Sequence, residues 1–133
     1  MIDFKIGQSA TLSQTITDSD IKSFAAISGD NNPIHINEEF AGQSRFKKRI
    51  AHGLMSASFF SALFGTKLPG TGCVYVSQKL DFLKPVYIGD TVTATVTIKQ
   101  IDVKKRRLFF DTICTVKGIT VISGEAEIYL PKP

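Results

Sequence analysis

The sequence contains no tryptophan, only two cysteines, and no apolar run long enough to cross a membrane. The longest mostly apolar stretch, residues 54–65, is about 12 residues long and includes three serines, whereas a membrane span needs about 20 residues. Cys73 and Cys114 are too few for a disulfide framework, so we expect reduced thiols. The first residues lack the basic start and apolar run of a signal peptide, which favours a cytoplasmic protein with no membrane partner.

Charge of either sign is also modest. The net charge of +4 comes from 16 basic and 12 acidic residues, and the basic ones cluster at 47–49 and 104–107. Neither cluster is interleaved with aromatics or belongs to a nucleic-acid motif, so we predict no nucleic-acid partner. We interpret both clusters as solvated turns, with a site for the phosphates of an anionic cofactor as the alternative. The length of 133 residues predicts one domain, 1–133.

The first third of the chain carries clear local signals. Residues 10–16 alternate polar and apolar side chains, which is typical of a strand. Thr17 or Asp18 is placed to cap a helix that ends at Gly29. Pro33 disfavours helix in the residue before it, so we predict a loop over 30–36. Asn37 is then placed to cap a short helix.

The remainder predicts one long helix followed by strands. The helix, residues 54–66, is apolar almost all the way round, which is typical of a helix buried on most sides. Runs of about ten residues joined by short turns predict an antiparallel meander. The expected strands are residues 74–83, 91–101, 108–116 and 119–130. We therefore predict an α+β protein in which a curved antiparallel sheet of about five strands wraps one long buried helix, the hot-dog arrangement.

Two segments place polar groups beside this helix. Asp30 and His35 lie in the loop bent by Pro33, where a carboxylate and an imidazole can converge on one water and exchange protons with it. Gly53 begins the helix, where free N–H groups and the absence of a side chain suit a carbonyl oxygen that gains negative charge. Each signal is weak alone, because Asp-Asn-Asn-Pro is commonly a plain turn and His-Gly a plain helix boundary.

Together the two segments resemble a known motif. Asp30-x-Asn32-Pro33-Ile34-His35, followed by Ile50-Ala51-His52-Gly53-Leu54-Met55, resembles the hydratase-2 motif of MaoC-like hot-dog proteins. The best match in size and pattern is the short (R)-specific enoyl-CoA hydratases that feed polyhydroxyalkanoate synthesis. Residues 58–61, 68–72 and 80–90 also fit the family, so the resemblance covers nearly the whole chain as a single MaoC-like domain.

The resemblance implies syn addition of water to a trans-2-enoyl-CoA, which gives (R)-3-hydroxyacyl-CoA, and the reverse dehydration. Asp30 and His35 match the family's catalytic pair, and the Gly53 amide matches the group that polarises the thioester carbonyl. Asn32 and Ser61 match positions that support the pair through hydrogen bonds.

The resemblance also implies a homodimer with an acyl-CoA thioester as substrate and no cofactor. We expect His52 to be structural and no metal site, because His35, Glu38 and Glu39 lack the spacing of a strong metal motif. The acyl tail is expected in a pocket beside the central helix. The candidate substrate-binding residues are Phe59, Phe60, Leu63, Leu68 and Val74.

Three alternatives stay open at this stage. The first is a dehydratase that takes acyl carrier protein instead of CoA, since the basic cluster at 47–49 suits CoA phosphates or an acidic carrier equally well. The second is a hot-dog thioesterase, which the lack of an acid in residues 54–66 disfavours. The third is a non-catalytic acyl-CoA-binding subunit, which the presence of both Asp30 and His35 disfavours.

Overall fold

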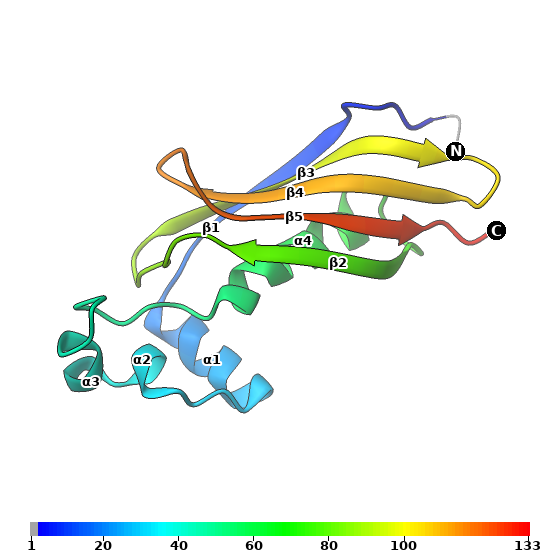
Figure 1. Ribbon diagram of the computed structural model, residues 1–133. Helices are drawn as coiled ribbons and strands as arrows, with labels where there is room; N and C mark the ends of the chain where they lie inside the picture. Colours follow the sequence, from blue (N-terminus) through cyan, green and yellow to red (C-terminus); the bar gives the residue numbers. More distant parts are fainter. Residues whose placement is uncertain (1–2) are drawn as a thin grey trace.

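The computed structural model describes residues 3–133 and contains one antiparallel sheet with a long helix against it (Figure 1). Within these residues the sheet has five strands, in the order β1-β3-β4-β5-β2. This confirms the predicted α+β fold. The strands are β1 (Ser9–Thr15), β2 (Val74–Phe82), β3 (Thr91–Asp102), β4 (Arg107–Val116) and β5 (Ile119–Tyr129).

The predicted meander holds only for β3, β4 and β5, which pair consecutively. Strand β2 pairs with β5 and β1 pairs with β3, so β1 and β2 form the two edges of the sheet. The expectation that β2 precedes β3 in a hairpin is therefore wrong. Residues 83–90 leave the sheet, and Tyr87 forms an isolated bridge with Ile50, which holds this connection away from β3.

Helix α4 (Gly53–Thr66) packs one side against the sheet, where Phe60, Leu63 and Phe64 are almost completely buried. The opposite side is exposed, although burial on most sides was predicted. The sheet curves around only one side of the helix, so it cannot cover the other. The exposed residues there include Leu54, Ser58, Ser61, Ala62 and Gly65. No helix within residues 3–133 has the length and hydrophobicity to cross a bilayer.

Helix α1 (Asp18–Ser28) has the predicted ends. The Thr17 hydroxyl accepts a hydrogen bond from the Asp20 amide, and the Asp20 carboxylate accepts one from the Thr17 amide, which is a capping box. Gly29 ends the helix with a φ of 80°, a conformation that glycine adopts without strain. These caps fix the direction in which the chain enters the next segment.

The segment after Gly29 was predicted as a loop, and this is wrong in part. Pro33 begins a short helix, α2 (Pro33–Ile36), because at the first helical position its missing N–H removes no hydrogen bond. The Asn32 side chain caps α2, and Asn37 caps α3 (Glu38–Gly42) as expected. Figure 1 shows α1, α2 and α3 gathered near the start of α4, below the sheet.

The two basic clusters differ from one another. In the cluster at 104–107, Lys104 and Lys105 lie exposed in the β3–β4 turn as predicted, whereas Arg106 and Arg107 are half-buried and Arg107 begins β4. The cluster at 47–49 is not a fully solvated turn, because Arg49 is buried, with 6% of its surface exposed. Lys47 adopts a left-handed conformation with a φ of 67°, and this reversal of the chain lets Arg49 turn inward while Lys47 and Lys48 stay exposed.

Candidate active site

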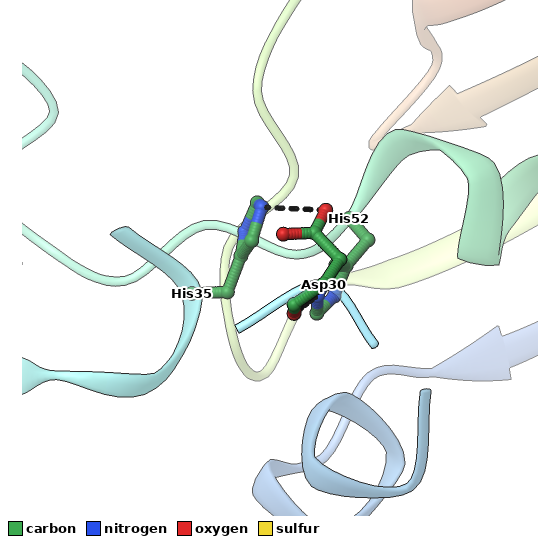
Figure 2. A group of neighbouring side chains, drawn as sticks. All are labelled: Asp30, His35 and His52. Atoms are coloured by element: carbon green, nitrogen blue, oxygen red, sulfur yellow. Dashed lines mark hydrogen bonds and ion pairs between the residues drawn. The ribbon is translucent and has the colours of Figure 1, made fainter. Parts of the chain in front are cut away.

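Asp30 is held by its immediate neighbours in the turn that follows α1. Its backbone amide donates to the Ser28 hydroxyl, and its Oδ1 accepts a hydrogen bond from the Asn32 amide at 3.1 Å. Its Oδ2 lies 3.9 Å from Nε2 of His35, as the dashed line in Figure 2 shows. The carboxylate is half exposed, so it reaches solvent and the imidazole at the same time.

His35 lies on α2 and is 8% exposed. Its Nδ1 lies 2.7 Å from the backbone oxygen of Ile50. Because a carbonyl oxygen only accepts hydrogen bonds, Nδ1 carries the proton and Nε2 presents a lone pair toward Asp30. Burial lowers the pKa of His35 below its usual value. The ring is therefore a neutral base at neutral pH, with its basic nitrogen already oriented.

Arg49 secures the backbone of His35 from inside the molecule. Its Nε donates to the His35 backbone oxygen at 2.6 Å. Its Nη1 forms ion pairs with Asp18 at 2.7 Å and Glu38 at 3.2 Å, which joins the start of α1 to α3. Lys22 and Arg49 lower the pKa of Asp18, so this carboxylate stays charged. Arg49 thus positions the short helix on which His35 lies.

His52 stands directly before α4 and is 3% exposed. Its ring stacks on the His35 ring, with the centroids 3.9 Å apart and 27° between the ring planes. Asp30, His35 and His52 offer ligand atoms within 4.8 Å of one another, the spacing of a possible metal site. Imidazole lone pairs lie in the ring plane, so two stacked rings direct them side by side rather than toward one ion. The arrangement suits proton transfer better than metal binding.

Gly53 is the first residue of α4, and no side chain caps this end of the helix. The first N–H groups of a helix have no partner within it, so they are available to an incoming oxygen. A side chain would not fit here, because a Cβ at Gly53 would lie 2.5 Å from the ring of Phe82. Glycine therefore allows Phe82 to pack directly on the start of the helix.

These groups open into one cavity of about 390 Å³. Asp30, His35 and Gly53 all line it, so the structure brings together the three residues expected to carry the chemistry. The remaining wall is mainly apolar, with the cationic side chains of Arg45 and Lys84. The other lining residues are Phe24, Phe46, Ile50, Ala51, His52, Leu54, Phe82, Leu83, Pro85, Val86 and Ile122.

The two residues expected to support the pair lie in different places. The Asn32 side chain accepts a hydrogen bond from the Ile34 amide and so caps α2, which carries His35. Ser61 lies on the exposed side of α4, in a second hollow that it shares with Ser58, Tyr75 and Val76. Within one chain, therefore, Asn32 belongs to the site and Ser61 does not reach it.

None of the five candidate acyl-binding residues lines the cavity. Phe60, Leu63 and Leu68 are core residues, and Val74 is exposed at the start of β2. Phe59 lies in a groove between α1 and α4, next to Phe24 and Met55. Much of the apolar wall comes instead from the apolar residues within 82–86. These residues belong to the stretch 80–90, whose fit to the MaoC-like family was the one feature of the sequence that could have indicated them.

Comparisons with known proteins agree with this geometry. Residues 3–124 match the family of the MaoC like domain. The chain belongs to that family. The MaoC-like chain is 54% identical over 129 residues to an (R)-specific enoyl-CoA hydratase of Rhodospirillum rubrum, an alignment that covers 97% of this chain and 90% of that protein.

A solved structure and a more distant relative complete the comparison. The (R)-hydratase of Aeromonas caviae involved in PHA biosynthesis matches the MaoC-like chain with a TM-score of 0.94 and 38% identity, covering 96% of this chain and 98% of that one. A mitochondrial 3-hydroxyacyl-[acyl-carrier-protein] dehydratase of Arabidopsis thaliana is 35% identical, covering 96% of this chain and 78% of that protein. The enoyl-CoA hydratase of Rhodospirillum rubrum, at 54% identity, is thus considerably more similar to this chain than the plant acyl-carrier-protein dehydratase, at 35%.

Proposed function

We propose that this MaoC-like protein is an (R)-specific enoyl-CoA hydratase that adds water reversibly to trans-2-enoyl-CoA. One observation carries the proposal. A neutral imidazole, His35 Nε2, and a carboxylate oxygen, Asp30 Oδ2, lie 3.9 Å apart at a cavity that Gly53 also lines. That separation is too long for a direct hydrogen bond but suits one water held by both groups.

The chemistry follows from the proton positions. The water oxygen forms a bond to C3 of the enoyl group as His35 Nε2 accepts one of the water's protons. The electron pair of the C2=C3 bond moves toward the thioester carbonyl and gives an enolate. The enolate then takes the proton from Nε2 at C2, on the face from which water attacked. Asp30 orients the water and balances the charge on the imidazolium. Both groups end as they began, and one water has been added.

Gly53 acts on the opposite end of the conjugated system. Negative charge builds on the carbonyl oxygen as water attacks, and the free N–H at the start of α4 stabilises it, with help from the helix dipole. One such donor is typically worth about 2.7–4 kcal/mol in the transition state. The thioesterase alternative loses support because α4, residues 53–66, carries no Asp or Glu.

The first prediction tests this function through its stereochemistry. The pair acts from one face of the bound enoyl group, so hydration of crotonyl-CoA should give a single enantiomer, the (R)-alcohol. We expect enoyl absorbance to fall while an added (S)-specific 3-hydroxyacyl-CoA dehydrogenase forms almost no NADH. An (R)-specific dehydrogenase serves as the positive control. Rapid NADH formation with the (S)-specific enzyme contradicts the proposal, and release of free thiol would indicate a thioesterase instead.

The carrier is CoA in this proposal. Arg45 and Lys84 line the cavity and are exposed, and Arg45 stacks on the ring of Phe46 at 4.6 Å. Two cations at the entrance suit the phosphates of CoA. Lys47 and Lys48 add exposed positive charge next to Arg45 in the sequence. The buried Arg49 is excluded from this role because its charged atoms face Asp18 and Glu38.

The second prediction tests the carrier. Replacing Arg45 and Lys84 together by Met should raise KM for crotonyl-CoA by roughly 3- to 10-fold, the size expected for two exposed ion pairs, with kcat unchanged. Crotonyl-pantetheine lacks the nucleotide phosphates and should show no such change. Lys104→Met, at the distant β3–β4 turn, is the matched control. Faster turnover of crotonyl-acyl carrier protein than of crotonyl-CoA by the unmodified protein would favour the dehydratase alternative.

We also propose a homodimer formed along β2. This edge strand exposes backbone groups that can pair with a second chain, and it carries the exposed side chains of Val74, Tyr75 and Val76. The exposed side of α4 lies beside it, and a hollow of about 400 Å³ separates the two. A second copy would cover both features, and an obligate interface of this kind typically buries roughly 2,000 Å² or more. A cytoplasmic location stays a prediction.

The third prediction concerns this assembly. Light scattering should give a mass about twice 14.6 kDa at micromolar concentration. Val76→Asp places a charge in the proposed interface and should produce inactive monomers. Val103→Asp, at a more exposed apolar residue in the β3–β4 turn, should leave the dimer and the activity intact. A fully active monomer would contradict the assignment of β2 as an obligate interface.

A further inference from the structure

His52 is a buried titratable group that the proposed reaction does not use. It is the residue before α4, yet its side chain does not cap the helix. The ring turns instead toward the chain segment that carries Asp30 and His35, as Figure 2 shows. A polar ring with 3% exposure that leaves its own helix uncapped has its principal contacts elsewhere.

Those contacts involve both members of the catalytic pair. His52 Nε2 lies 3.0 Å from the backbone oxygen of Asp30, so Nε2 carries the proton and donates it. The ring stacks on His35 at 3.9 Å, and the ring of Phe24 packs against it at 4.9 Å. Nδ1 is buried and has no hydrogen-bond partner in residues 3–133. His52 is therefore enclosed in one orientation, with its Nε2–H committed to the backbone of Asp30.

We propose that His52 is a positioning residue of this site, in addition to Arg49: its Nε2–H fixes the backbone of Asp30 while its ring fixes the plane of His35. The inference rests on the proposed hydratase function but assigns a role that the reaction steps do not require. It has a structural basis, because Asp30 and His35 otherwise belong to a short turn and a helix of four residues. A displacement of about 1 Å in such a pair can lower the rate by 10²-fold.

The stacked ring has an electrostatic consequence as well. The groups that face His35 are Asp30 at Oδ2, His52 across the stack and the Ile50 carbonyl at Nδ1. Burial is the main cause of the lowered pKa of His35, and the imidazole of His52 stacked on it lowers that pKa further. The same ring excludes water from one side of His35, which acts in the same direction. Replacing His52 by a residue without an imidazole should therefore raise the pKa of His35.

Three variants of His52 separate its hydrogen bond to Asp30 from its ring stacking on His35. His52→Gln keeps an amide N–H where Nε2–H stood, His52→Phe keeps the stack without the donor, and His52→Ala keeps neither. With crotonyl-CoA we expect His52→Ala to lower kcat by about 10²-fold while KM changes by no more than about 3-fold. The kcat of His52→Gln should be at least about tenfold higher than that of His52→Ala. Unchanged kcat in His52→Ala, or an effect confined to KM, overturns the proposal.

A second readout does not depend on activity. The chain has only two histidines, so His52→Gln leaves His35 as the sole imidazole, and its NMR titration is unambiguous. The pKa of His35 should be higher in His52→Gln than in the unmodified protein, and an equal or lower value overturns the electrostatic role. Circular dichroism confirms that each variant is folded. If the unmodified protein itself fails to hydrate crotonyl-CoA, the proposed function is wrong, whereas the NMR comparison still tests the contact between the two rings.

Discussion

Asp30→Asn and His35→Ala should each lower the rate of enoyl-CoA hydration by at least about 10²-fold, the lower range for loss of a general acid–base group. Asn at position 30 can still accept the hydrogen bond from the Asn32 amide, so the turn keeps its shape while the carboxylate is lost. Ala at position 35 removes the Nε2 lone pair that faces the cavity. The measurement is the loss of enoyl absorbance with purified, folded protein.

The matched control for this pair is Asp111→Asn. Asp111 is an exposed carboxylate on β4, between two buried neighbours that face the core, so it lies on the outer face of the sheet. We expect its replacement to leave turnover within about twofold of the unmodified protein. Near-normal turnover by Asp30→Asn or His35→Ala would remove both residues from the chemistry. Equal losses in all three variants would point to general destabilisation instead.

Gly124→Ala should have the largest effect on stability. Gly124 on β5 pairs with Leu80 on the edge strand β2, and a Cβ at Gly124 would overlap the backbone oxygen of Lys79. Backbone cannot move aside as a flexible side chain can, so β2 must separate from β5. We expect a loss of at least about 3 kcal/mol, at the upper end for single substitutions, and a fall in Tm of roughly 10 °C.

Thermal and chemical unfolding provide the measurement for Gly124→Ala. Gly42→Ala is the control, because a Cβ at Gly42 meets no atom within 4 Å and its φ is not positive. We expect its Tm to change by no more than a few degrees. If Gly124→Ala is as stable as Gly42→Ala, then β2 has room to shift at this position and the close approach of the two strands is not required.

Features that depend on neighbouring residues could be predicted from the sequence. The caps at Thr17 and Gly29 and the helix after Asn37 each require only two or three adjacent residues, and all three are present. Asp30, His35 and Gly53 were expected together, and they line one cavity. Here the motif supplied what local rules could not, because the pair converges only through the fold of the intervening chain.

Features that depend on distant packing could not be predicted in the same way. Lys47, Lys48 and Arg49 look equivalent in sequence, and only the chain reversal at Lys47 decides that Arg49 turns inward. Phe60 and Leu63 satisfy a helical pattern equally well as core or as cavity wall, and the sheet decides that they are core. The exposed side of α4 is apolar or small, so its composition does not distinguish a buried face from one that a second chain covers.

The arrangement of the cavity has a consequence for how the protein can change. The hydrogen bonds that orient the catalytic pair come from one short stretch, residues 28–53, which the carboxylate of Asp18 and the ring of Phe24 support from α1. Residues 83–85 line the same cavity, and within residues 3–133 they form no hydrogen bond with Asp30 or His35. One part of the substrate wall is thus encoded apart from the segment that holds the proton-transfer groups. Replacements of Leu83 or Pro85 should therefore change which acyl chains fit the cavity without altering the groups that transfer protons.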